Sequence, residues 1–299
     1  IEESRITRLF QDSTKNHRIE NLDIVSFNLD FEKQTERSEI RYGAEAYANF
    51  VASNAFARNI YNGETNRLDT RYPDGGSRMT GLAAYFTQSW ELGKKKRIVL
   101  SDGLRFSKVD LFSRFIDQTF FNFPFSQVSQ SNEALTGHLG MVFNASKKNR
   151  YHVNFSTGFR APNVDDLSKV FESTAGTVIV PNPNLSPEYA YNGELGYAHT
   201  FYEKFTVSGL VYGTLLNNAL SVQEGTFNGS STIFYEGELS QVVQLANNQQ
   251  AFVTGFEGGV SGDIYKHFAV YGNINLTKGR IIKDTTVFAT TPLAHIPPM

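Results

Sequence analysis

The chain has 299 residues, with 28 Lys plus Arg against 30 Asp plus Glu and a formal net charge of -2. This balance argues against a nucleic-acid binder, which carries a strongly basic surface. The absence of cysteine excludes a disulfide framework, a thiolate metal site and a cysteine nucleophile. No apolar run approaches the roughly 18 residues of a membrane-spanning helix. The first five residues do not resemble a signal peptide, so we expect a removed leader or a longer parent protein.

Apolar and polar residues alternate along most of the chain. From Val25 to Phe31 every second residue is apolar, and the same pattern runs from Ile40 to Phe50. Period-two alternation is typical of a strand with one apolar face. The face assignment between Phe205 and Leu216 is ambiguous. We predict about ten strands, with further segments at Leu82–Trp90, Ile98–Phe106, Leu135–Phe143, Tyr151–Phe159, Tyr189–Phe201, Phe252–Val260 and Phe268–Leu276.

Connections between these strands are alternately short and long. Short charged turns, such as the one from Gly93 to Lys96, alternate with irregular stretches near residues 53–78, 110–133, 160–188 and 217–248. Several loops of this length are unusual in a compact soluble domain. A transmembrane antiparallel β-barrel explains them, with short periplasmic turns and long extracellular loops. A soluble sandwich or propeller is the alternative fold.

The stretch from Phe155 to Glu188 contains the most specific motifs. A strand ends at Arg160-Ala161-Pro162, and the chain returns to the sheet through Pro181-Asn182-Pro183-Asn184-Leu185. Proline cannot donate to an interior ladder, so these prolines mark where the chain leaves and re-enters the sheet. The two motifs, followed by Glu194-Leu195-Gly196, resemble those of TonB-dependent outer-membrane receptors. Weaker landmarks of the same family are LSDGLRF at 100–106, GFE at 255–257 and PLAHIPP at 292–298.

This resemblance implies a barrel of about 22 strands around a plugged lumen. It also implies uptake of a scarce nutrient across the outer membrane of a Gram-negative bacterium, driven by the TonB complex through an N-terminal plug. We interpret residues 1–299 as a barrel segment without the plug domain, because half a barrel would leave two sheet edges unpaired in lipid. The expected partners are the TonB complex, outer-membrane lipid or lipopolysaccharide and a small-molecule cargo.

Two charge patterns accompany the predicted barrel. Asp102 is an unexplained charge on an apolar face, and a bulge beside Gly103 would reconcile it with the alternation. The polar faces carry charges that should point into the lumen and pair with the plug or with water, namely Asp30, Glu32, Arg41, Glu45 and Arg105.

Five residues are candidate cargo ligands. Arg160, Asn182 and Asn184 lie in the paired motifs, where a structural role at the barrel rim is the competing interpretation. Phe121 and Phe123 belong to an aromatic cluster at 120–125, which could hold an apolar ligand or pack loops together.

Two acidic stretches could be metal sites, Asp165-Asp166 and the run from Asp69 to Asp74. Neither has the full ligand spacing of a calcium site, so we interpret them as solvated loop carboxylates. No cofactor is expected, and no nucleophile–base pair indicates an enzyme.

Three functions remain open. They are a TonB-dependent transporter, a passive porin and a soluble carbohydrate-binding or adhesive protein. For the transporter we expect a siderophore-like chelate, a cobalamin-like cofactor or an oligosaccharide as cargo. Haem is less favoured because residues 163–181 contain no histidine and only His295 falls in a long loop. A tyrosine could replace histidine as an axial ligand.

Overall fold

The computed structural model describes residues 1–169, 171–174, 176–235, 237–265, 267–284 and 289–293. They form one sheet of 16 strands, antiparallel except where β10 runs parallel to β14. The elements in chain order are β1 (Glu2–Thr7), β2 (Thr14–Gln34), β3 (Ser38–Asn59), β4 (Thr65–Arg67), β5 (Ser77–Leu92), β6 (Ile98–Arg114), β7 (Gln127–Asn144), β8 (Asn149–Arg160), α1 (Val164–Ser168), β9 (Phe171–Thr174), β10 (Thr177–Val180), β11 (Glu188–Phe201), β12 (Phe205–Glu224), β13 (Thr232–Tyr235), β14 (Glu238–Tyr265), β15 (Phe268–Asp284) and β16 (Ala289–Pro292).

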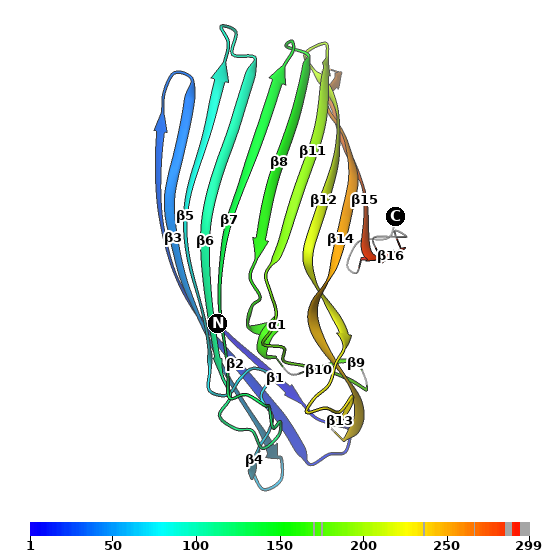
Figure 1. Ribbon diagram of the computed structural model, residues 1–299. Helices are drawn as coiled ribbons and strands as arrows, with labels where there is room; N and C mark the ends of the chain where they lie inside the picture. The colour runs from blue at the N-terminus through cyan, green and yellow to red at the C-terminus, as the bar shows by residue number, and fades with distance from the viewer. Residues whose placement is uncertain (170, 175, 236, 266, 285–288, 294–299) are drawn as a thin grey trace.

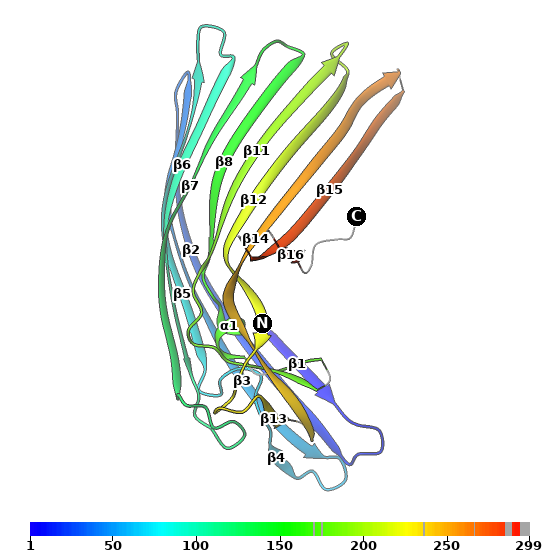
Figure 2. The ribbon, with the colours of Figure 1, turned by 45° about the vertical axis from the view of Figure 1, so that its right-hand side comes forward.

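The long strands lie side by side in chain order, from β2 through β3, β5, β6, β7, β8, β11, β12 and β14 to β15. Figures 1 and 2 show them as a tall sheet that curves like part of a barrel and leaves one side open. The short turns gather at the upper end in Figure 1, and the loops with α1 gather at the lower end. This confirms the prediction of an all-β antiparallel architecture. No helix in the described ranges is long and apolar enough to cross a membrane.

The strand register confirms the predicted faces. Phe27 is 62% exposed on the outer surface of β2, as are its apolar neighbours along the strand. The ambiguous segment, now β12, places Val207 and Val211 on the outer face, since Val211 pairs with the outward-facing Leu195 and Phe256. The sequence left this segment open because its inner face also carries apolar residues such as Leu210.

The expected bulge beside Gly103 is absent from the described strands. Pairing of β6 with β5 and β7 runs without a register shift through Asp102, which lies opposite Gln88 and Leu139. Asp102 therefore points outward with the apolar residues of β6.

Several loops are shorter than the sequence predicts because the strands continue past the apolar belt. β6 extends to Arg114 and β7 begins at Gln127, inside the stretch expected to be irregular. Likewise β12 reaches Glu224 and β14 starts at Glu238. Beyond the lipid both faces of a hairpin can be polar, so the backbone ladder persists where the apolar alternation stops. Alternation therefore marks the lipid boundary, not the strand end.

The buried core lies at the loop end of the sheet. Leu111 and Val128 from the strand extensions pack there with Leu167 of α1 and with Val178 and Val242. Leu167 is fully buried. A segment far from the membrane belt thus has the packed interior of a small soluble domain.

The face opposite the exposed apolar residues carries a repeated contact. A ring on one strand covers a glycine directly opposite it, so that a Cβ at that glycine would overlap the ring or crowd it closely. The five pairs are Tyr47 with Gly81, Tyr85 with Gly43, His138 with Gly103, His152 with Gly196 and Tyr212 with Gly255.

Candidate functional site

The loop end contains an aromatic cluster that includes both predicted phenylalanines. The ring centroid of Phe123 lies 4.8 Å from that of Phe115 and 5.5 Å from that of Phe227. Phe121 stacks on Tyr235 at 5.7 Å. These rings come from the β6–β7 loop, from the β12–β13 loop and from β13, so they pack distant segments together. This is the structural role that the sequence left as an alternative.

Phe115, Phe121 and Phe123 of this cluster line a cavity of about 450 Å³ between the loops, which we call the vestibule. Most of its charged side chains already have partners. Arg67 Nη1 lies 2.9 Å from Asp117 Oδ2, and Arg18 Nη2 lies 3.1 Å from Asp69 Oδ1. The vestibule therefore presents rings framed by ion pairs. Its lining includes Phe115, Phe120, Phe121, Phe123, Tyr72 and Arg71.

Tyr72 occupies a central position that sequence reasoning missed. Its hydroxyl donates a 2.5 Å hydrogen bond to Asp165 Oδ1, and the charged groups of Arg71 and Lys169 lie 5.7 and 6.0 Å from its ring centroid. Burial raises the pKa of the Tyr72 phenol, and the Asp165 carboxylate raises it further. The phenol therefore stays protonated as a donor at neutral pH. No local motif marks Tyr72, since its partner is 93 residues away.

Arg160 holds the rim of the sheet together. It lies 2.7 Å from Asp166 Oδ2 at the start of α1 and 2.5 Å from Glu188 Oε2 at the start of β11. Glu188 in turn accepts a hydrogen bond from the backbone N–H of Leu220. Asn163 caps α1 in a reciprocal pair with Asp166. Arg160 thus joins β8 to β11 and α1, and Glu188 extends this network to β12.

The two predicted asparagines serve the same rim. Asn182 donates to the carbonyl of Leu245 at 2.7 Å and accepts from the backbone N–H of Asn184 at 3.0 Å. Gln130 donates to the carbonyls of Pro183 and Leu185. The structure brings Phe121 and Phe123 to the vestibule but not Arg160, Asn182 or Asn184. Contact with a cargo stays a prediction for all five.

In both acidic stretches, carboxylates are already bonded to other groups of the chain. Asp165 accepts from Tyr72 and lies 3.3 Å from Lys169. Asp74 accepts from two backbone N–H groups in the β6–β7 loop. Nowhere in the described part of the chain do three His, Asp or Glu side chains gather as a metal site.

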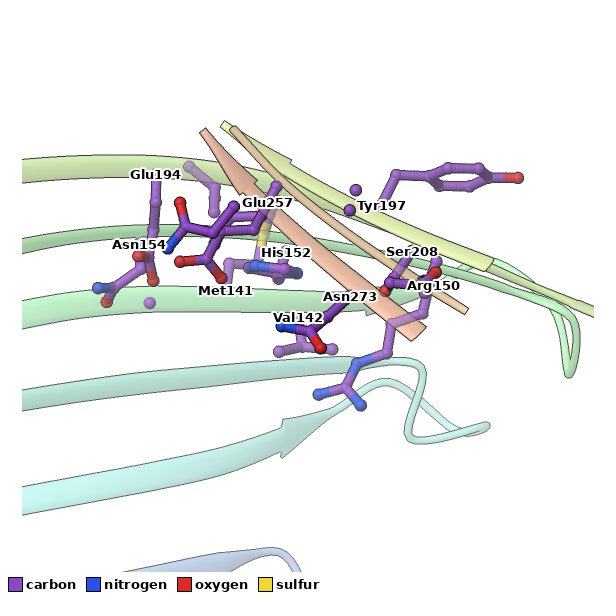
Figure 3. A pocket seen from close by; sticks show the side chains of 18 of the residues that line it. Met141, Val142, Arg150, His152, Asn154, Glu194, Tyr197, Ser208, Glu257 and Asn273 are labelled. Atoms are coloured by element: carbon purple, nitrogen blue, oxygen red, sulfur yellow. Dashed lines mark hydrogen bonds between the residues drawn. The ribbon is translucent and has the colours of Figure 1, made fainter. Parts of the chain in front are cut away.

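A larger cavity, of about 790 Å³, lies against the inner face of the sheet, in the half nearer the short turns (Figure 3). Arg150, His152 and Asn154 reach it from β8, and Glu194 and Glu257 reach it from β11 and β14. This face is polar, as predicted for a lumen lining.

Several of the predicted lumen charges pair within the wall. Arg105 Nη2 lies 2.5 Å from Glu45 Oε2, and Arg41 Nη2 lies 3.3 Å from Glu32 Oε2. Tyr85 donates to Asp30.

Comparison with known proteins agrees with this architecture. Residues 4–299 match the family described as TonB dependent receptor-like, beta-barrel. Over 143 residues the chain is 28% identical to the probable hemoglobin and hemoglobin-haptoglobin-binding protein 4 of Haemophilus influenzae, a match covering 48% of this chain and 12% of that protein.

Two solved structures share the fold. The copper transporter OprC superposes with a TM-score of 0.71 at 13% identity, covering 95% of this chain and 40% of that one. The ferric yersiniabactin uptake receptor FyuA of Yersinia pestis gives a TM-score of 0.61 at 15% identity, covering 94% and 38%. The chain therefore spans about two-fifths of the length of these receptors.

The family match, the outward apolar belt and the polar inner wall agree with the sequence motifs at 158–162 and 181–188. The chain therefore belongs to the TonB-dependent receptor family, whose members are non-enzymatic proteins of the Gram-negative outer membrane, and forms part of its β-barrel.

Proposed function

We propose that this chain is part of the wall and the extracellular vestibule of a TonB-dependent importer. The observation that carries the proposal is the combination of the family match with an aromatic cavity at the loop end. The full importer would contain further strands that close the barrel and a plug that contacts TonB and fills the lumen. The polar cavity beside Arg150, Glu194 and Glu257 supports such a plug surface.

The proposed cargo is a siderophore-like chelate, with a cobalamin-like cofactor or an oligosaccharide as alternatives. All three combine apolar faces, which can pack on exposed rings such as Phe120, with polar groups that can reach the ion pairs around those rings. Other family members carry names that state copper transport and ferric yersiniabactin uptake.

Haem is the competing cargo, since the Haemophilus relative is named for binding hemoglobin. The lining of the vestibule argues against it, because no histidine among the described residues reaches that cavity. His17 stacks on Phe56 at 4.7 Å, and His199 Nδ1 lies 2.8 Å from Asn149 Oδ1. His295 lies outside the described residues. Titration of the full-length receptor with haemin should show no saturable one-to-one Soret shift.

Uptake by cells expressing the full-length receptor tests the transport proposal. Labelled ferric chelates, cobalamin and maltooligosaccharides are offered with and without a protonophore that collapses the inner-membrane potential. Uptake of one of them should stop when the membrane is de-energised. Entry that continues unchanged would support the passive porin instead.

The vestibule is tested separately with Phe121→Ala and Phe123→Ala. We expect each to weaken binding of the accepted cargo by about 10-fold, since a contact with an aromatic ring contributes about 0.5–1.5 kcal/mol beyond the apolar area that it buries. Phe155→Ala is the matched control, because Phe155 is 60% exposed on the outer face. Equal loss in all three variants would remove the vestibule from the proposal.

A further inference from the structure

A second, smaller cavity lies beside the vestibule. It has a volume of about 280 Å³ and is lined by residues of β1, β2, β3 and β5 and by the start of α1. Tyr72 lines both cavities, so the two share this side chain.

The lining of this cavity is rich in acceptors. Three carboxylates reach it, those of Glu3, Glu20 and Asp165, together with the side chains of Asn21, Asn49 and Asn163. No lysine, arginine or histidine side chain is among the described residues that line it. Ile1 lines it as well, and the amino group of Ile1 donates a 2.8 Å hydrogen bond to the carbonyl of Leu22. The cavity therefore favours a positively charged, hydrogen-bond-donating occupant.

Glu20 is the acceptor that lacks a partner. It is 8% exposed, and its Oε1 atom receives no hydrogen bond in the structure. A buried carboxylate oxygen without a donor is costly, which distinguishes it from a solvated loop carboxylate. The other two acids are engaged, because Asp165 accepts from Tyr72 and Glu3 lies 3.9 Å from Arg71.

The register explains why Glu20 has no partner. Glu20 pairs with Glu3 across β1 and β2, so the nearest side chain on that strand repels it instead of donating to it. Burial raises the pKa of Glu20 and the nearby Glu3 reinforces this shift, whereas the charges of Arg71, Arg5 and Arg18 oppose it. The outward apolar run of β2 ends at Asp23 and Asn21. Glu20 lies beyond these residues, outside the membrane belt and toward the loop end.

We propose that Glu20 is the acceptor of a binding site for an ammonium or guanidinium group at the back of the vestibule. Such a group brings several N–H donors to acceptors that are spread around the cavity. A metal ion fits less well, since no three metal-type ligands converge in the described chain. The inference does not depend on the identity of the transported cargo.

Equilibrium dialysis of labelled methylguanidinium against the full-length receptor tests the site. We expect saturable one-to-one binding that weakens about 10-fold or more in Glu20→Gln, because a charged hydrogen bond is lost. Glu20→Asp keeps the negative charge but moves it back by one methylene group. Its affinity for methylguanidinium should lie between that of the unaltered receptor and that of Glu20→Gln. Glu133→Gln, on the outer face beside Lys108, is the matched control and should bind normally. Tetramethylammonium, which has no N–H donor, should not compete.

The cation can also come from the receptor itself, as a lysine of another segment. Zero-length carbodiimide coupling distinguishes this source, because an amide between Glu20 and that lysine is detected by peptide mass spectrometry without added ligand. Either saturable binding or this cross-link supports the site. A cavity that shows neither, or that binds methylguanidinium equally in Glu20→Gln, holds only water, and the proposal is then wrong.

Discussion

The barrel wall and the loop end solve the burial of apolar groups in opposite ways. Along the wall the apolar side chains point outward and the polar ones inward, so that Leu104 is 59% exposed while Arg105 pairs with Glu45. At the loop end Leu167 and Val128 are buried among other loops, as in a soluble domain. The apolar side chains of the wall are covered by lipid, whereas those of the loop end are covered by other residues of the chain. The effect of a substitution on stability should therefore depend on lipid in the wall and on protein packing at the loop end.

The largest expected effect is in the loop core. Leu167→Ala should destabilise the loop end by about 2–5 kcal/mol, because it opens a cavity in a fully buried cluster. The measurement is limited proteolysis of the loops in the detergent-folded receptor, with Leu104→Ala as the wall control. The wall control should leave loop protection unchanged. Equal loop cleavage in both variants would mean that the two regions are not independent.

The next effect is on the lipid-facing side of the wall. Phe27→Arg should cost about 2–4 kcal/mol in a liposome folding assay, because a cation replaces an aromatic ring near the midplane. Asn28→Arg, one residue along on the lumen side, should be much milder. Equal losses would contradict the assignment of faces.

A stabilising change should come from the outward charge. Asp102→Leu should raise the free energy of unfolding in liposomes by about 1–2 kcal/mol, since acidic residues on the lipid face are less costly than Arg or Lys but still unfavourable. Leu100→Asp, two residues along the same face, is the reverse control and should destabilise. A loss of stability in Asp102→Leu would indicate that this carboxylate has a partner in the membrane.

The smallest effect concerns pH. Because the pKa of Glu20 is raised above its ordinary 4.5, the folded state holds that proton more tightly. The resulting stability is fully present below pH 4.5 and is lost as the pH rises through the folded pKa. Glu20→Gln should flatten this part of the pH profile of loop protection, while Glu133→Gln should leave it unchanged. An unaltered profile in Glu20→Gln would show that Glu20 titrates normally.

The wall could be predicted from sequence because its rule is local. The alternation at Val25–Phe31 can be read from residues that are adjacent in sequence, and it requires only that one face of the strand meets an apolar environment. The same rule gave loops that were too long, because it detects lipid and not hydrogen bonding, as the extension of β12 to Glu224 shows. Phe121 and Phe123 could be found by composition. Glu20 and Tyr72 could not, since their roles arise from contacts between segments far apart in the chain.

The glycines covered by rings on the inner wall have a consequence for assembly. A slip of two residues between neighbouring strands keeps every apolar side chain outward, so the alternating pattern cannot reject it. It would, however, move Tyr47 from Gly81 onto Met79 or Ala83, and His152 from Gly196 onto Glu194 or Ala198. Each ring then meets a Cβ instead of an empty site. In the five pairs each ring fits only opposite a residue without a Cβ. The pairs therefore select one strand register among those that keep the apolar side chains in lipid.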